Sequence, residues 1–250
     1  SPRYLLRRQL VLDRLATEVP GKLLDIGCGP GALLYELSAL GWSCSGLEQS
    51  EQALAIARKV HRDPGRAAIF DNPPESWAGY FDWIVCMEVL EHIEDDLAAL
   101  RNWREWLRPG GKLLLSVPAH MRKWNPSDVW AGHFRRYERE PLKRLLEEAG
   151  FAVGDLWSYG VPVSNLIEPI RGWHRGRLIK QAAAKEKDPF SKHEGTNRSG
   201  TERSLEKRLF PLANGFLGVA AFRFSNWLQH RFVHSDLGTG YLAVACKPRP

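Results

Sequence analysis

The segment that most constrains the fold of this chain spans residues 23–31 and reads LLDIGCGPG. Its apolar start predicts a short buried strand. Its glycines allow positive φ angles and a close approach of the backbone to a ligand, and a helical pattern over 32–40 follows directly. In an open α/β sheet a turn of this kind lies beyond the carboxyl end of a strand, where ligands bind.

The rest of the chain repeats this alternation of strands and helices. Strands are predicted at 22–26, 44–47, 67–70, 81–87, 112–117, 151–157 and 241–246. Helices are predicted at 3–18, 32–40, 51–60 and 95–107, and a further helix is marked by an apolar face around Leu142 and Leu146. Pro109, Gly110 and Gly111 are expected to stop the fourth helix. Strands that alternate with helices predict βαβ units and a parallel sheet.

The positive charge of the chain is concentrated near its C-terminus. Residues 161–240 contain 13 Lys or Arg and 7 Asp or Glu, whereas the remainder of the chain is neutral because the total net charge is +6. We divide the chain into a core at 1–160, a helical basic insertion or cap at 161–238, and a final strand and tail at 239–250. The stretch 182–201 is expected to be a polar loop, and 205–232 one or two helices.

Four readings of the insertion stay open. It could recognise an acceptor that carries phosphate or lipid, lie on an anionic membrane, bind single-stranded nucleic acid, or pack as a plain cap or dimer interface. The four cysteines form no CxxC pair, and residues 1–12 lack the apolar core of a signal peptide. These features favour the cytoplasm, with peripheral membrane contact through 161–238. The sequence does not predict an oligomeric state.

An acidic residue ends the second predicted strand. Glu48 lies there, at a spacing from Asp25 that suits hydrogen bonds to both hydroxyls of a ribose. The glycine spacing Gly27-x-Gly29-x-Gly31 differs from the dinucleotide pattern GxGxxG, which argues against a nicotinamide-dependent oxidoreductase.

Four segments together resemble class I S-adenosylmethionine-dependent methyltransferases: LLDIGCGPG at 23–31, GLEQ at 46–49, FDWIVCMEVLEHI at 81–93 and LRPGGKLLLSVP at 107–118. The resemblance implies a Rossmann-like three-layer α/β sandwich. Its seven-stranded sheet would be mostly parallel, with the last strand antiparallel and inserted beside 151–157.

The resemblance also implies roles for residues around the turn. Asp25, Gly27, Cys28, Gly29 and Gly31 would surround the methionine part of S-adenosylmethionine. Glu48 would hold the ribose, Gln49 and Asp71 would border the adenine, and Met87 would pack nearby. Asp71 could instead be a turn acid before two prolines, and Met87 a plain core residue.

The segment Glu88-Val89-Leu90-Glu91-His92 is the candidate for catalysis. If it begins a helix, Glu88, Glu91 and His92 share one face, where they could hold a metal ion or relay a proton. The spacing resembles ubiquinone-biosynthesis O-methyltransferases and small-RNA 2′-O-methyltransferases, in which it is associated with Mg²⁺. The alternative is that the two carboxylates only favour a helix N-terminus.

A second cluster follows the fifth predicted strand and is expected to fold over the acceptor. His133 could be a base or a metal ligand, Trp124 and Trp130 could line the acceptor pocket, and Arg135 and Arg136 could grip an anionic group. Alternatively, His133 and the two arginines pin the loop to the edge of the sheet through hydrogen bonds.

These residues together predict methylation of a small or medium-sized acceptor, free or linked to a lipid or glycan, at oxygen. An RNA 2′-O-methyltransferase and a non-catalytic cofactor-binding module are the alternatives. The neutral core argues against a nucleic-acid partner.

Overall fold

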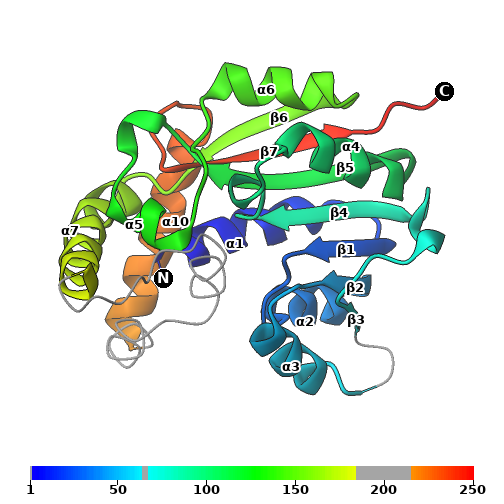
Figure 1. Ribbon diagram of the computed structural model, residues 1–250, viewed down its shortest axis with the longest axis horizontal. Coiled ribbons are helices and arrows are strands. Elements are labelled where there is room, and N and C mark those ends of the chain that lie inside the picture. Colours follow the sequence, from blue (N-terminus) through cyan, green and yellow to red (C-terminus); the bar gives the residue numbers. More distant parts are fainter. Residues whose placement is uncertain (1, 64–66, 184–214) are drawn as a thin grey trace.

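The computed structural model describes residues 2–63, 67–183 and 215–250 and contains one twisted sheet of seven strands in the order β3-β2-β1-β4-β5-β7-β6 (Figure 1). The strands are β1 Lys22–Ile26, β2 Ser43–Leu47, β3 Ala67–Phe70, β4 Phe81–Met87, β5 Leu107–Pro118, β6 Ala152–Tyr159 and β7 Gly240–Cys246. The helices are α1 Pro2–Leu15, α2 Ala32–Ala39, α3 Glu51–Val60, α4 Asp96–Trp106, α5 Pro126–Ala131, α6 Arg139–Glu148, α7 Val163–Ala183 and α10 Phe216–Phe232.

The strand directions confirm the predicted fold. Neighbouring strands from β3 through β5 are parallel, whereas β7 is antiparallel to both β5 and β6. Leu242 of β7 is paired with Ser116 of β5 on one side and with Trp157 of β6 on the other. The last strand of the chain is therefore inserted between β5 and β6, as expected.

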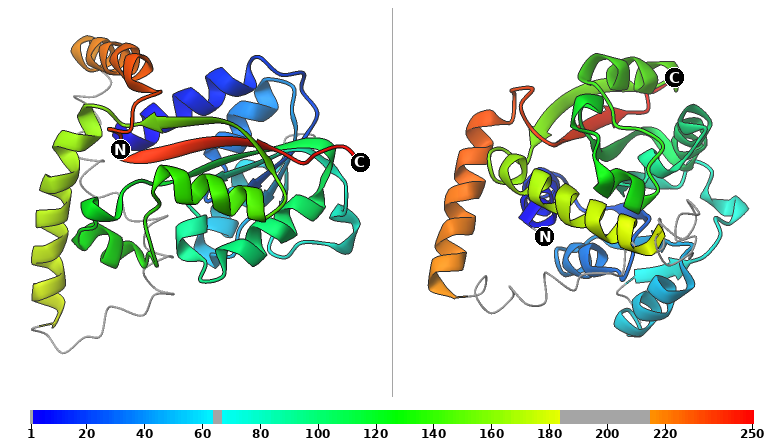
Figure 2. Two further views of the ribbon diagram at one scale, coloured as in Figure 1. Left: turned by 90° about the horizontal axis from the view of Figure 1, so that it is seen from above. Right: turned by 60° about the vertical axis from the view of Figure 1, so that its left-hand side comes forward.

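Alternating side chains of the strands build a separate core on each face of the sheet. Trp83 and Leu114 pack with the apolar faces of α1 and α2, whereas Ile84 and Leu115 pack with α4 and α6. Figure 2 shows the resulting three layers, with the sheet between two sets of helices. Each fully buried aliphatic side chain contributes about 1.5–3 kcal/mol through the hydrophobic effect.

The segment between β6 and β7 contributes α7 and α10. Both helices lie at the end of the molecule to which β1 and β4 point, together with α5 and the start of α1 (Figure 1). The described residues do not include 184–201, which belong to the predicted polar loop. They also do not include 205–214 of the predicted helical region. Among the residues that the structure describes, none of the helices is long and apolar enough to cross a bilayer.

Two local predictions differ from the structure. The fourth helix ends before Pro109, at Trp106, but the strand predicted from residue 112 already begins at Leu107, so Pro109, Gly110 and Gly111 lie in an irregular part of β5. At Gly111 a Cβ atom would come within 2.9 Å of the Arg108 carbonyl oxygen, so the strand tolerates only glycine there. The helix expected to start at Glu88 is a single 3₁₀ turn over Leu90–His92, preceded by Glu88 in a left-handed conformation with φ of 59°.

Candidate functional site

The glycine turn after β1 lies at the carboxyl edge of the sheet. Gly27, Gly29 and Gly31 have φ angles of 68°, 55° and 79°. A Cβ atom on Gly27 would approach Val89 to 2.4 Å, and one on Gly31 would approach His61 to 2.6 Å. At Gly29 a Cβ atom would have no neighbour within 4 Å, so the turn leaves room beside its backbone.

Glu48 contacts this turn directly. Its carboxylate accepts hydrogen bonds from the backbone amide of Gly29 at 2.8 Å, from that of Gln49 at 2.9 Å and from that of Ser50 at 2.8 Å. The parallel pairing of β1 and β2 produces this contact, because it brings the carboxyl ends of the two strands side by side. The turn and the acidic residue therefore form one polar site.

The other expected cofactor residues surround this site at different depths. Asp25 is buried, and burial together with the nearby Glu48 charge raises its pKa to about 8. Burial also raises the pKa of the Cys28 thiol, which makes that thiol a neutral wall of the turn. Asp71 lies exposed after β3 with its carboxylate 3.2 Å from Arg58, and Met87 packs at the end of β4 against the core beside α1 and α2.

Glu88 turns away from the 3₁₀ segment and toward α1. Its carboxylate lies 2.7 Å from Arg3 and 3.4 Å from Arg7, and it accepts a hydrogen bond of 2.6 Å from the Tyr159 hydroxyl. Burial alone would favour the neutral carboxyl, but the two guanidinium groups outweigh it and lower the pKa of Glu88 to about 2. Arg3, Arg7 and Tyr159 were not predicted as residues of the site. The repeat of arginine at i and i+4 in the first helix was visible, but it does not reveal which group those arginines face.

Glu91, His92 and His133 come together instead. One ligand atom from each lies within 4.8 Å of the others, and the rings of His92 and His133 meet edge to face with centroids 4.7 Å apart. Glu91 is fully buried and neither carboxylate oxygen has a hydrogen-bond partner. Burial and the neighbouring Glu88 charge hold the pKa of Glu91 well above its usual range, while burial and His133 lower the pKa of His92 to about 4.

This cluster corrects the predicted grouping of Glu88, Glu91 and His92. The three residues do not share a helix face, because the positive φ of Glu88 reverses the direction of its side chain before the 3₁₀ turn begins. His133 is the third member of the cluster in place of Glu88, and its Nδ1 lies 3.0 Å from the Asp128 carboxylate. A carboxylate on one ring nitrogen fixes the orientation of the imidazole and leaves Nε2 for other chemistry.

The loop after β5 is held mainly by its own ion pairs. The Arg136 guanidinium is buried and forms two hydrogen bonds, of 2.8 and 2.9 Å, with Asp128. Arg135 lies 2.6 Å from Asp96 and donates to the Glu94 carbonyl. The two arginines therefore hold the loop through contacts with Asp128 of α5 and with residues around the start of α4.

The two tryptophans of that loop lie near α5. Trp124 is partly buried directly before the helix, and Trp130 lies within it. The Arg175 guanidinium of α7 lies 4.5 Å from the centroid of the Trp130 ring. Trp130 therefore contributes to the contact between α5 and α7.

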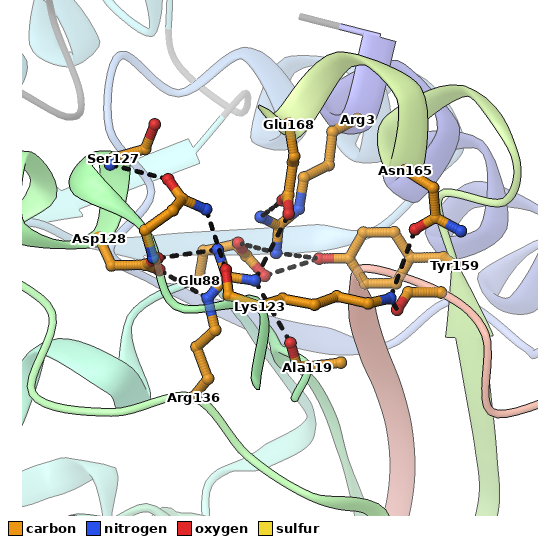
Figure 3. A network of polar contacts seen from close by, with 12 residues as sticks. Arg3, Glu88, Ala119, Lys123, Ser127, Asp128, Arg136, Tyr159, Asn165 and Glu168 are labelled. Carbon is orange, nitrogen blue, oxygen red and sulfur yellow. Dashed lines mark hydrogen bonds and ion pairs between the residues drawn. The ribbon is translucent and has the colours of Figure 1, made fainter. Parts of the chain in front are cut away.

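Buried charges link the loop to the catalytic candidates. Glu168 of α7 lies 3.4 Å from Arg136 and 2.9 Å from Arg3, and Arg3 in turn contacts Glu88 (Figure 3). Alternating charges in low dielectric hold one another ionised and fix the relative positions of their elements. The network connects α1, the end of β4, the loop after β5, and α7.

Comparisons with known proteins agree with this architecture. A family model described as methyltransferase domain matches residues 3–156. A ubiquinone biosynthesis O-methyltransferase from Pseudomonas aeruginosa is 34% identical over 111 residues, which cover 42% of this chain and 48% of that protein. One from Vibrio parahaemolyticus is 32% identical over 118 residues, which cover 45% and 50%. The chain thus matches about half the length of these relatives.

Solved structures share the fold at low sequence identity. A phosphoethanolamine N-methyltransferase from Haemonchus contortus in complex with S-adenosylmethionine has a TM-score of 0.57 and 18% identity, and it covers 97% of this chain and 52% of its own. The magnesium protoporphyrin IX methyltransferase from Synechocystis has a TM-score of 0.51 and 19% identity, with coverage of 64% and 80%. Since the family model matches more than half of the chain and the sheet has the order expected from the resemblance, the protein belongs to the class I S-adenosylmethionine-dependent methyltransferase family.

Proposed function

We propose that this protein transfers the methyl group of S-adenosylmethionine to an oxygen atom of a small or medium-sized acceptor, free or linked to a lipid or glycan. The contact between the Gly29 amide and the Glu48 carboxylate carries the proposal. This contact places the open backbone of the glycine turn beside a carboxylate that can accept hydrogen bonds. Both lie at the carboxyl edge of the sheet, where nucleosides bind in open α/β folds. The name of the relatives, ubiquinone biosynthesis O-methyltransferase, supports oxygen as the methylated atom.

We assign the cofactor contacts as follows. The turn 27–31 accommodates the methionine part, since a Cβ atom on Gly29 would meet no neighbour. Glu48 accepts hydrogen bonds from the ribose hydroxyls, and Gln49, Asp71 and Met87 border the adenine end and the sulfur. Asp25 can accept a hydrogen bond from the ammonium group, and the nearby Arg7 guanidinium can pair with the carboxylate of the methionine part.

The residues near His133 have the chemistry that an oxygen acceptor needs. The cofactor supplies a methyl group already activated on a sulfonium sulfur. As the new carbon–oxygen bond forms and the carbon–sulfur bond breaks, the acceptor hydroxyl must lose its proton. His133 can take that proton on Nε2 because its Nδ1 faces the Asp128 carboxylate, and a positioned base typically contributes about 10²–10⁴-fold.

As the alternative to His133 acting as the base, we propose that Glu91, His92 and His133 hold a divalent cation, in which case His133 Nε2 coordinates the cation and does not take the proton. A fully buried carboxylate without a hydrogen-bond partner fits a metal ligand, and the low pKa of His92 keeps its imidazole neutral and able to coordinate. Two imidazoles and one carboxylate suit Mn²⁺, Fe²⁺ or Zn²⁺ better than Mg²⁺, which prefers oxygen ligands. Such a cation would lower the pKa of an acceptor hydroxyl.

The cofactor assignment predicts a specific loss of affinity. Replacing Glu48 by alanine should weaken binding of S-adenosylhomocysteine by about tenfold or more, because two ribose hydroxyls lose their acceptor. Isothermal titration calorimetry measures this loss. Glu51→Ala, an exposed acid in the first turn of α3, is the matched control and should leave the affinity unchanged. Equal affinities of the two variants would contradict the ribose assignment.

The cation assignment predicts metal binding by the whole chain. Titration with Mn²⁺ should reveal one site, and Glu91→Gln should weaken it by about tenfold or more because the only anionic ligand is lost. His230→Asn, at an exposed position of α10, is the control. Absence of binding by the unmodified protein, or equal binding by Glu91→Gln, would contradict the assignment without affecting the cofactor site.

Product analysis separates the competing activities. Transfer of a labelled methyl group to phenolic or hydroxylated acceptors would support the proposal. Transfer to the 2′-hydroxyl of an oligonucleotide would favour RNA methylation instead. Tight cofactor binding with no transfer to any acceptor and no turnover of the cofactor would indicate a non-catalytic module.

A further inference from the structure

One side of α7 exposes an apolar stripe. Leu166, Ile170 and Trp173 follow one another at helical spacing and are 70%, 66% and 62% exposed. Residues at i, i+4 and i+7 lie on one face of a helix. Scattered single apolar residues are ordinary on a protein surface, but a continuous row on one helix face indicates an interaction site.

Packing of the face next to the stripe fixes the orientation of the stripe. Gly172 and Gly176 face α5 so closely that a Cβ atom on Gly172 would lie 2.9 Å from the Asn125 side chain, and one on Gly176 would lie 3.3 Å from Pro126. α5 therefore occupies the inner side of α7. The helix cannot rotate the stripe inward without losing this contact.

α10 presents a second apolar surface of the same kind. The rings of Phe224 and Trp227 stack with centroids 5.8 Å apart and are 62% and 54% exposed. The inner side of the helix is anchored by Gln229, which accepts a hydrogen bond from the Gly160 amide at 2.9 Å and donates one to the Leu6 carbonyl. Phe224 and Trp227 are thereby held outward.

Cations accompany both apolar surfaces. The Arg177 guanidinium lies 4.4 Å from the centroid of the Trp173 ring, and that of Arg231 lies 5.4 Å from the centroid of the Trp227 ring. Glu168 is the one acid in the sequences of α7 and α10, and it points inward to Arg3 and Arg136. The outer faces of the two helices are therefore apolar and positively charged, with no carboxylate of their own to neutralise them.

We propose that the outer faces of α7 and α10 bind the surface of an anionic lipid bilayer. Tryptophan and arginine together suit the headgroup region, where the ring enters the apolar boundary and the guanidinium meets phosphate. Leu166 and Ile170 favour lipid over nucleic acid, since aliphatic side chains give bases no ring to stack on. Neither helix qualifies as a membrane span among the described residues, so the contact is interfacial.

Both helices lie at the cofactor end of the sheet (Figure 2). Binding there would bring the carboxyl edge of the sheet close to the bilayer surface, which suits an acceptor embedded in lipid. Bilayer binding itself does not depend on methyl transfer, so the two proposals can fail separately.

Flotation of the whole chain with vesicles tests the proposal. The protein should float with vesicles that contain about one third phosphatidylglycerol and should be released at high ionic strength, because screened headgroups no longer attract the arginines. It should not float with pure phosphatidylcholine. The double variants Trp173→Ser with Trp227→Ser, and Arg177→Glu with Arg231→Glu, should each reduce the floated fraction by about tenfold.

Matched controls lie outside the two helices. Val19→Ser removes an exposed apolar residue at the opposite edge of the sheet, and Arg144→Glu reverses an exposed charge on α6; both variants should float like the unmodified protein. Calorimetry with S-adenosylhomocysteine should show that every variant still folds and binds cofactor. The proposal is overturned if the unmodified protein does not float with anionic vesicles, or if the double variants float equally well. It is also overturned if the double variants instead abolish self-association or oligonucleotide binding.

Discussion

Folding of the chain opposes ionisation of the Asp25 carboxyl group. Its side chain is buried beneath the glycine turn, close to the Glu48 carboxylate, and its pKa rises to about 8. An unfolded chain would lose this proton near the ordinary value of 3.8. Unfolding between these pH values therefore releases a proton, so the stabilisation that neutral Asp25 provides is full below pH about 4 and is lost as the pH rises toward about 8.

Replacing Asp25 by asparagine should remove this pH dependence. Asparagine has the same shape and no proton to lose, so the variant should gain stability relative to the unmodified protein by up to about 1.4 kcal/mol for each pH unit across that window. Urea denaturation at several values between about pH 4 and pH 9 measures the difference. A difference that stays constant with pH would mean that Asp25 is ionised in the folded protein.

Glu88 and His133 show how single residues escape sequence analysis. The segment 88–92 indicated two carboxylates and an imidazole, but grouping Glu88 with Glu91 and His92 required a regular helix from Glu88 onward. The left-handed backbone of Glu88 and its attraction to Arg3 and Arg7 removed it from the group. His133 joins Glu91 and His92 instead of Glu88, because the loop after β5 lies against the end of β4. A local sequence pattern cannot predict such a contact between distant segments.

At the scale of elements, the ion-pair network decides where α7 lies. Glu168 is its only acid and joins α1 through Arg3 and the loop after β5 through Arg136. These side chains are mostly buried, so removing the charge leaves two guanidinium groups with incomplete compensation. The position of α7 should therefore depend strongly on this one carboxylate.

Replacing Glu168 by glutamine should loosen α7. If the substitution lowers the free energy of local opening by about 1.4 kcal/mol or more, the backbone amides of α7 and of the first turn of α1 should exchange hydrogen about tenfold faster. Hydrogen-exchange mass spectrometry measures this rate. Leu166→Gln, on the outer face of the same helix, is the control and should leave exchange unchanged. Equal exchange in both variants would show that packing against α5 alone positions the helix.

At the scale of the whole molecule, the alternation of strands and helices was sufficient to predict a parallel sheet, whereas the antiparallel last strand followed only from the resemblance to methyltransferases. The predicted spans of β1, β3, β4 and α3 agree with the structure, because apolar strands and amphipathic helices each have a distinct period. The span of β5 was predicted too short, because a Pro-Gly-Gly segment indicates a turn when its neighbours in space are unknown. In the structure, residues 108–111 form an irregularity of β5 between the pairs Leu107–Phe81 and Lys112–Trp83, and backbone hydrogen bonds with Lys247 hold Gly110 and Gly111 there.

The sequence by itself determined the fold class, the glycine turn, and the residues placed at the carboxyl edge, since these follow from hydrophobic period and backbone freedom along a continuous stretch of chain. Only the tertiary structure decided that Glu88 joins Arg3, that His133 joins Glu91 and His92, and that Arg135 and Arg136 hold the loop. These partners are far apart in the sequence. Their pairing depends on burial, because an unpaired charge in the interior costs several kcal/mol of free energy. Each buried charged side chain therefore pairs with an opposite charge that the fold places nearby.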